Sequence, residues 1–345
     1  TRIGFRQVEI NKRRLLVNGV PVKLYGVNSH QQHPRLGHAM NEETIRKDFE
    51  LMKRLNINNI RTSHYPPTTR YLELADEYGF YIIDEVGNEA HATEHLSSLP
   101  EWLPAYLERT EKLVLRDRNH PSIIMWSAGN ESGEGDNIGR TIARGKELDP
   151  TRPGWMYGAN SDDLYPAKGM ACEDIIGPRY PTPMELEYRV ARIPESEDPR
   201  PSYMDEYLSA TGNSIGTLDE YWDIIHRYPR CIGGAIWDWV SPGLDVPLSW
   251  VQDYSASSLR GVLMGNISAI PGRQGKAVSL SGNDEWIEFY RDPKLDITGK
   301  ELSLSIWLKP SSWNGGKSIL TKGANQYGLR QLSASEVEFY LHTGK

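Results

Sequence analysis

The chain has 345 residues, a formal net charge of −7 and a sequence pI of about 5.8. It shows no basic patch, which argues against a nucleic-acid partner, and no apolar run approaches the roughly 18 residues of a membrane span. The two cysteines, Cys172 and Cys231, form no C-x-x-C pair, so neither a zinc site nor a redox pair is indicated, and we expect two buried thiols.

Ten Trp and eighteen Tyr residues accompany only five Phe residues. Trp and Tyr combine flat apolar faces with a polar group, which suits sugar rings, although a large Trp-rich core would give the same composition. The first residues, TRIGFRQVEI, do not have the form of a signal peptide, and both ends read like the middle of a protein. We therefore expect the chain to be a fragment of a longer one.

Residues 5–25 alternate between apolar and polar side chains around an Asn18-Gly19 step. This pattern is a strong hairpin signal. We predict that residues 1–22 form a hairpin that leads into a larger domain.

Eight strand-like runs alternate with helical patterns over residues 23–244. The helical patterns carry an apolar face and begin at capping residues such as Asn41; the later ones cover 68–78, 101–118, 137–148 and 217–228. In the first helix the predicted apolar face consists of Ile45, Phe49, Met52 and Leu55. The strand-like runs cover 23–28, 57–63, 80–86, 123–126, 154–158, 174–180, 203–204 and 233–240.

This alternation predicts an α/β protein with a (β/α)8 TIM barrel over residues 23–244. A doubly wound open sheet is the alternative, because periodicity does not reveal whether a sheet closes. Polar residues at nearly every strand end favour the barrel, whose catalytic groups lie at the carboxyl ends of its strands.

The pattern changes after Gly243. Residues 245–275 have no clear period and are predicted to be a linker. Residues 276–345 contain short alternating runs (AVSLSG, EWIEFY, LSLSIWLKP and VEFYLH), which predict part of an all-β sandwich. The stretch DPKLDITGKELSLSIWLKP resembles the laminin-G-like, concanavalin-type (jelly-roll) sandwiches that often accompany carbohydrate enzymes.

Two glutamates follow predicted strands. Glu131 ends the stretch IIMWSAGNE, and Glu206 ends the stretch YMDE. Alone, either could cap a helix or pair with an arginine. Together they suit glycosidic bond cleavage, in which one carboxylic acid protonates the leaving oxygen and one carboxylate attacks the anomeric carbon.

The motifs WSAGNESGEG and DEY…GNS resemble glycoside hydrolase family 2, particularly its β-galactosidase branch. The resemblance covers roughly residues 1 to 244. It implies that Glu131 is the acid/base and Glu206 the nucleophile of a retaining exo-β-glycosidase. It further implies that Asn130 binds the sugar 2-hydroxyl, that Arg61 keeps the nucleophile ionised, and that other side chains contact the sugar or nucleophile: His30, His64, Tyr180 and Trp237.

The resemblance also implies a magnesium ion between Glu89, His91 and Glu131. A hard cation with carboxylate ligands and one imidazole is chemically plausible, although Glu89 and His91 could instead form a structural ion pair. No organic cofactor is expected, and a homo-oligomer is compatible with the family.

The sequence departs from the β-galactosidase pattern after the nucleophile. Ser209 replaces the histidine that helps to read the 6-hydroxyl end of the sugar, and the run continues through Gly212, Asn213 and Ser214. An Asn-x-Lys clamp of the β-glucuronidase type is not found here, and we expect the family's upstream domains to lie outside this fragment. Trp239 faces the same way as Trp237 by alternation, so one of the two is a candidate for the core rather than the site.

We therefore predict a β-galactosidase acting on the ends of β-galactosidic glycans. The alternatives are another specificity within the family (a modified galactose, an arabinoside or a glucuronide) and a non-catalytic carbohydrate-binding protein.

Overall fold

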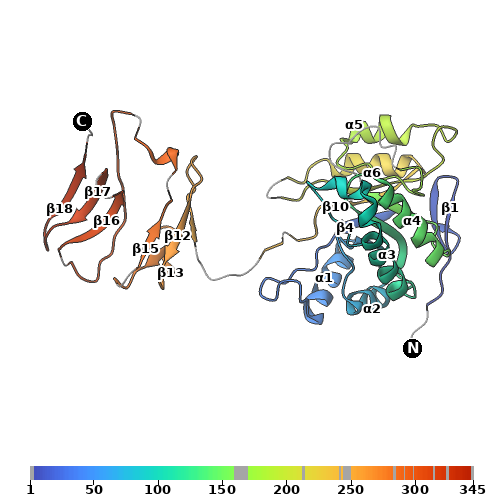
Figure 1. Cartoon of the computed structure of the whole chain (residues 1–345), viewed down its shortest axis with the longest axis horizontal. Helices are drawn as coiled ribbons and strands as arrows, with labels where there is room; N and C mark the ends of the chain where they lie inside the picture. The colour runs from blue at the N-terminus through green and yellow to red at the C-terminus, as the bar shows by residue number, and fades with distance from the viewer. Residues whose placement is uncertain are drawn as a thin grey trace. The chain divides into compact units, whose positions relative to one another are not determined.

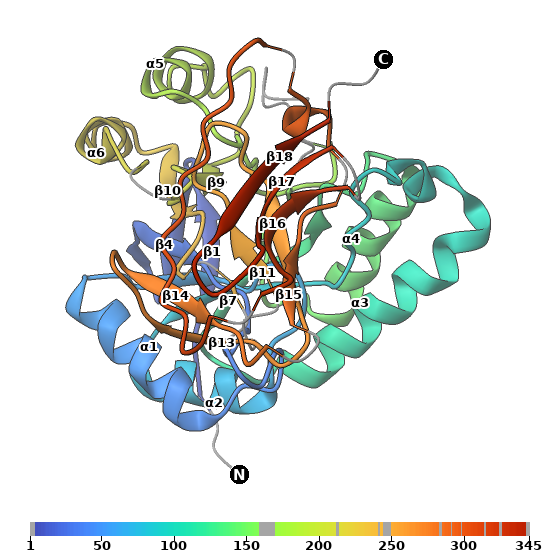
Figure 2. The same cartoon turned by 90° about the vertical axis from the view of Figure 1, so that its left-hand side faces the viewer.

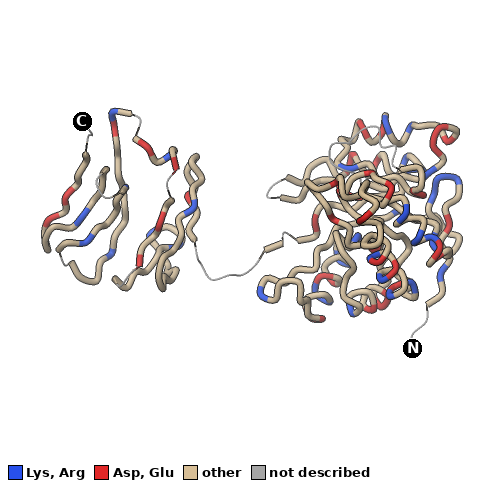
Figure 3. Tube along the Cα trace, in the orientation of Figure 1, with Lys and Arg blue, Asp and Glu red and all other residues tan. Residues whose placement is uncertain are grey.

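The structure, a computed structural model, describes residues 4–158, 170–211, 214–240, 242–243, 250–282, 285–290, 292–297, 299–313, 315–323 and 326–342. The chain divides into two compact units, Thr1–Asp245 and Val246–Lys345 (Figure 1). Lys and Arg are interspersed with Asp and Glu along both units (Figure 3). Among the described residues, no helix has the length and apolar character needed to cross a membrane.

The predicted hairpin is present as an antiparallel sheet of β1 (Val8–Asn11), β2 (Arg14–Val17) and β3 (Val20–Pro21). Asn18 and Gly19 connect β2 and β3 with φ angles of 52° and 77°. Gly and Asn adopt this left-handed region more readily than other residues, which is why the Asn-Gly step predicted the turn correctly.

In the described residues, the first unit is built on seven parallel strands in the order β8-β7-β6-β5-β4-β10-β9. Their bounds are β4 Leu24–Asn28, β5 Asn59–Arg61, β6 Tyr81–Glu85, β7 Ile123–Asn130, β8 Trp155–Gly158, β9 Ser202–Tyr207 and β10 Cys231–Ile236. The first strand, β4, pairs with both β5 and the last strand, β10. The sheet therefore closes into a barrel instead of ending in two edge strands, and the doubly wound alternative is wrong.

The eighth position of the barrel lies between β8 and β9. There the Ile175 amide donates to the Trp155 carbonyl at 3.3 Å, and Ile176 forms a parallel bridge with Ser202. The run 174–180 was predicted to be a full strand, but only this bridge forms. Pro178 follows almost directly, and its missing N–H interrupts strand pairing.

Helices surround the strands (Figure 2). They are α1 Glu42–Arg54, α2 Thr69–Tyr78, α3 Leu103–Asp117, α4 Asp136–Leu148, α5 Pro183–Glu185 with the π-helical turn Leu186–Ala191, and α6 Leu218–Arg227, with short 3-10 turns at Glu94–Ser98 and Pro100–Trp102. The Asn41 side chain caps α1 by accepting from the Thr44 amide at 2.9 Å. Leu55 was predicted to belong to the apolar face of α1, but it is the C-cap residue and is 65% exposed.

The core has separate layers on the two sides of the strands. Ile82 belongs to the cluster that packs between strands and helices, with Phe49 and Trp126, whereas its neighbour Ile83 belongs to a cluster with Leu24 and Tyr203 inside the barrel. Successive side chains of a strand point to opposite faces. A strand buried on both faces therefore reads as the continuous apolar run seen in the sequence.

The part of the second unit that the structure describes contains three small antiparallel sheets, β11-β12-β15, β13-β14 and β16-β17-β18. Their strands are β11 Trp250–Gln252, β12 Arg260–Met264, β13 Ser268–Pro271, β14 Lys276–Ser279, β15 Trp286–Glu288, β16 Lys317–Lys322, β17 Tyr327–Gln331 and β18 Val337–Leu341, with a 3-10 turn at Pro293–Leu295. This all-β arrangement is consistent with the expected partial sandwich, and its likeness to laminin-G-like domains stays a prediction.

Two predictions about this region are wrong in detail. The stretch 245–275, expected to be a linker, contributes β11, β12 and β13. The run 302–310 (LSLSIWLKP), expected to be a strand, forms no strand. An alternating sequence suits a half-buried strand, but a strand also requires a neighbouring backbone with which to pair.

Candidate active site

The two predicted catalytic carboxylates lie at the ends of strands β7 and β9. Glu131 has a φ of 40°, and its amide donates to the Gly158 carbonyl of β8 at 3.1 Å. Gly129 is needed at this turn, because a Cβ there would lie 2.5 Å from the Asn88 carbonyl oxygen. Glu206 belongs to β9 and is 5% exposed. The barrel thus brings both carboxylates to the same end.

Glu206 is held by donors from two segments of the barrel. Its Oε1 accepts from Arg61 Nη1 at 3.1 Å and lies 3.3 Å from Arg179 Nη2. Its Oε2 accepts from the Tyr180 hydroxyl at 2.9 Å. Arg61 and Tyr180 both contact the predicted nucleophile, and their roles stay predictions.

Arg61 is fully buried and connects Glu206 to a second carboxylate, Glu85. Arg61 Nε donates to Glu85 at 2.8 Å, and Glu85 also contacts His64 Nδ1 at 2.8 Å and the Ser127 hydroxyl at 2.6 Å. Burial by itself would raise the pKa of Glu85, but the charge of Arg61 and the bond to His64 outweigh it and lower this pKa to about 2. Glu85 is therefore ionised at neutral pH and fixes the orientation of Arg61 and His64.

An aromatic wall adjoins Glu206. His64 stacks on Trp237 with ring centroids 5.1 Å apart, and His30 lies edge-on to both rings at 5.4 Å. Burial, together with the neighbouring His64, lowers the pKa of His30 to about 4, so His30 is neutral near pH 7. Trp239 packs instead against the core between strands and helices. The structure thus distinguishes the site tryptophan from the core tryptophan.

Asn130 connects the two halves of the site and is 3% exposed. Its amide nitrogen donates to Glu89 at 2.9 Å, and its amide oxygen accepts from Arg61 Nη2 at 2.9 Å. These bonds fix which end of the amide faces which partner, so the side chain is already oriented before a sugar arrives.

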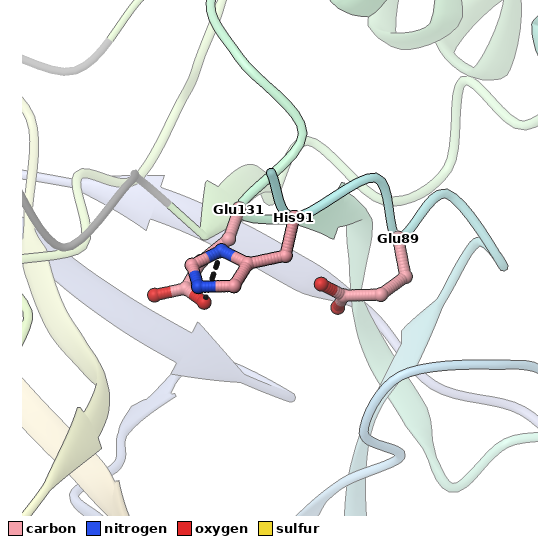
Figure 4. Close-up of side chains that lie close together, drawn as sticks. All are labelled: Glu89, His91 and Glu131. Carbon is pink, nitrogen blue, oxygen red and sulfur yellow. Dashed lines mark ion pairs between the residues drawn. The ribbon is translucent and has the colours of Figure 1, made fainter. Parts of the chain in front are cut away.

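Glu89, His91 and Glu131 lie together, and their candidate ligand atoms are all within 4.8 Å of one another. Figure 4 shows the Glu89 carboxylate on one side of the His91 ring and the Glu131 carboxylate on the other, with His91 Nδ1 3.1 Å from Glu131 Oε2. Partial burial raises the pKa of Glu89. Two carboxylates and one imidazole within this distance fit a divalent cation with a preference for oxygen ligands.

Sequence reasoning missed Arg179 and gave Asp205 no role, although both lie beside residues that it selected. Arg179 Nη1 is 2.7 Å from Glu131 Oε1, and Arg179 Nη2 bonds to Asp205 and to Asn130. An arginine directly before Tyr180 at a barrel strand end was the available signal.

The structure describes only part of the loop that departs from the family pattern. Ser209 is exposed, and its hydroxyl lies 3.4 Å from that of Thr211. Gly212 and Asn213 lie outside the described residues.

The parallel barrel is closed and carries two glutamates at its strand ends, next to a buried arginine and an aromatic wall. This combination is typical of the glycoside hydrolases with a barrel fold. Residues 8–257 match the family described as "Glycosyl hydrolases family 2, TIM barrel domain". The chain belongs to this family.

Relatives and solved structures agree with this assignment. The chain is 44% identical over 253 residues to a β-galactosidase of Vibrio vulnificus, covering 70% of this chain and 24% of that protein. It is 41% identical over 263 residues to a β-galactosidase of Photobacterium profundum, covering 73% and 25%. The chain thus spans about a quarter of the length of these relatives.

Solved structures with the same fold include β-glucuronidases. The Ruminococcus gnavus enzyme matches with a TM-score of 0.61 and 26% identity over 72% of this chain and 49% of that chain. The Dictyoglomus thermophilum enzyme matches with a TM-score of 0.60 and 24% identity over 72% and 49%, a likeness that shows the fold alone.

Proposed function

We propose that the protein is a retaining exo-β-glycosidase, and that its substrate is a glycan with terminal β-galactosyl residues. The observation that carries the mechanism is that Glu131 and Glu206 contact one guanidinium, that of Arg179, at 2.7 and 3.3 Å. A retaining mechanism requires the two carboxyl groups to lie about 5 to 5.5 Å apart, and a shared guanidinium is compatible with such a separation. The identity to two β-galactosidases supports the choice of sugar.

In the first step, a Glu206 oxygen attacks the anomeric carbon and forms a glycosyl ester, while Glu131 gives its proton to the departing oxygen. In the second step, Glu131 takes a proton from water, and this water cleaves the ester and restores Glu206. The Tyr180 hydroxyl and Arg61 Nη1 stabilise the negative charge that returns to Glu206 as the ester breaks.

We assign the remaining residues to binding. The Trp237 face offers an apolar surface for the sugar ring, and His30 and His64 offer ring nitrogens as donors or acceptors to hydroxyls. We assign to Asn130 the bond to the sugar 2-hydroxyl, a contact that strengthens in the transition state.

Glu89, His91 and Glu131 would hold a divalent cation such as Mg²⁺. Bound there, such an ion supplies positive charge next to the acid/base carboxylate. The protein's own part is to keep the three ligands together: Asn130 fixes Glu89, and His91 lies against Glu131.

The test is hydrolysis of nitrophenyl glycosides by the full-length protein, with Glu206→Gln as the inactive control. The panel contains β-galactoside, β-glucuronide, β-mannoside and α-arabinoside. Turnover of the β-galactoside that is lost in Glu206→Gln is the expected result. If another sugar is turned over instead, the two glutamates remain the catalytic residues, and we would attribute the changed specificity to Ser209 and its loop.

Two alternatives are distinguished by the same panel. A β-glucuronidase is favoured by the structural likeness to the Ruminococcus gnavus enzyme, and it would turn over the glucuronide. A non-catalytic carbohydrate-binding protein would turn over none of the four sugars. The unaltered protein and the Glu206→Gln variant would then bind glycan equally well.

A further inference from the structure

Arg179 is a buried cation between the two catalytic candidates, and the proposed reaction leaves it without a role. It is 2% exposed and lies in the segment between the Ile176 bridge and α5. Its Nη2 atom bonds to Asp205 and Asn130 and lies 3.3 Å from Glu206 Oε1, while its Nη1 atom lies 2.7 Å from Glu131 Oε1. A planar guanidinium is suited to several acceptors at once, because its N–H groups form a rigid fork.

A second cation next to Glu206 offsets the negative charge of the neighbouring buried carboxylates. The adjacent Asp205 is fully buried, and Arg61 already pairs with the buried Glu85. Arg61 lies 4.0 Å from Asp205, so without Arg179 a single guanidinium would serve three buried carboxylates. The other groups facing Glu206 are His64 at 3.7 Å, the Tyr180 hydroxyl and Asp238, whose pKa is raised chiefly by burial and also by Glu206. Unpaired charges at such sites are costly.

The barrel provides space for this guanidinium. β8 ends in Gly158, where an added Cβ would lie 2.6 Å from Arg179 Nη2 and 2.8 Å from both Asn130 Oδ1 and Asp205 Oδ2. A side chain at position 158 would therefore displace the guanidinium or its partners. Gly177 differs: a Cβ there would only touch Asp205 and Met156, at 3.4 Å.

We propose that Arg179 is a positioning residue for the nucleophile Glu206. Together with Arg61 it holds Glu206 Oε1, while Tyr180 holds Oε2, so the carboxylate plane is fixed by donors from two segments of the barrel. Asp205 and the cradle at Gly158 hold Arg179 itself in place. This inference rests on the proposed function, because it takes Glu206 to be the nucleophile.

The experiment compares Arg179→Met and Arg179→Lys in the full-length protein, using the nitrophenyl glycoside that the panel identifies. For Arg179→Met we expect kcat to fall roughly ten- to hundredfold with a smaller change in KM, because misplacing a reacting group by about 1 Å can cost about 100-fold. Loss of the positive charge should also move the acidic limb of the pH profile to higher pH. Arg179→Lys should restore the limb and part of kcat.

A 2-deoxy-2-fluoro glycoside of the same sugar measures the first step directly, because its adduct on Glu206 is detected by mass. Adduct formation should be slowed in Arg179→Met. Arg152 provides the matched control, because it is also a buried arginine that bonds to an aspartate, Asp149, but its hydrogen bonds lead away from the site. Arg152→Met should lower the melting temperature and leave the acidic limb unchanged.

Gly158→Ala tests the same inference if Arg179→Met does not fold. It should lower kcat and slow adduct formation, whereas Gly177→Ala should not. Unchanged kcat and acidic limb in Arg179→Met, or equal effects of the two alanine variants, would overturn the role of Arg179. Failure of the proposed function is a different result, namely turnover that survives Glu206→Gln.

Discussion

Tyr180 and Glu206 are joined twice. The Tyr180 hydroxyl donates to Glu206 Oε2 at 2.9 Å, and the Tyr180 amide donates to the Glu206 carbonyl at 2.9 Å. The second bond continues the pairing that closes the barrel between the segment after Ile176 and β9. The backbone pairing that closes the barrel therefore also brings the Tyr180 side chain to the carboxylate. At this position Tyr180 has a φ of 46°.

Tyr180→Phe should lower kcat roughly 10- to 100-fold with little change in the free energy of unfolding. A hydrogen bond to a charged group contributes about 1.5 to 3 kcal/mol, and this one acts on the charge that returns to Glu206. Steady-state kinetics on the nitrophenyl substrate measures the effect. Tyr188→Phe is the control, because Tyr188 is 59% exposed. Equal activity of the two variants would exclude a role of the hydroxyl in turnover.

Trp237→Ala should change mainly KM, whereas Trp239→Ala should change mainly the free energy of unfolding. Trp237 stacks on His64 in the site, so its loss should raise KM by roughly tenfold or more with a modest change in stability. Trp239 packs against the core, so its loss should cost up to about 3 kcal/mol of the free energy of unfolding. Kinetics and urea unfolding of both variants measure the pair. A raised KM in Trp239→Ala alone would reverse the assignment.

The stability of the barrel should fall in acid because of Glu85. Its pKa is about 2 in the folded protein, below its ordinary value of 4.5. A lowered pKa contributes stability that is present above pH 4.5 and lost as the pH falls toward 2, and the contribution is roughly 3 kcal/mol. Urea unfolding between about pH 6 and pH 2 measures it. Glu85→Gln should be less stable near neutral pH and should show a flatter dependence; an equally steep dependence would assign the loss to other carboxylates.

Removal of divalent cations should lower activity, and Mg²⁺ should restore it. Glu89→Gln and His91→Ala should weaken Mg²⁺ binding by at least about tenfold, the scale seen even for the outer partners of metal ligands. Titration calorimetry measures this binding independently of activity. His95→Ala is the control, because His95 is exposed nearby but outside the cluster. Equal Mg²⁺ affinity in Glu89→Gln and in the unaltered protein would argue against this site.

Most barrel elements were predictable because their signals are local. The apolar faces of α1 and α2 and the Asn41 cap are patterns of neighbouring residues along the chain. The strand-end polar residues were found in the same way, and the structure brings the predicted site residues to one end of the barrel or its adjoining loops. The second unit was predicted less well, because its short strands depend on pairing partners that alternation does not reveal.

By itself, the sequence determined the alternation of strands and helices, the position of Glu131 and Glu206 at strand ends, and the likeness to family 2. Only the tertiary structure decided that β4 and β10 pair to close the sheet, that Trp239 is the tryptophan that packs against the core, and that Arg179 joins both glutamates. The physical reason is that periodicity and capping depend on residues a few positions apart. Charge pairing and closure instead depend on which distant segments share a buried volume, where each ion must find its partner.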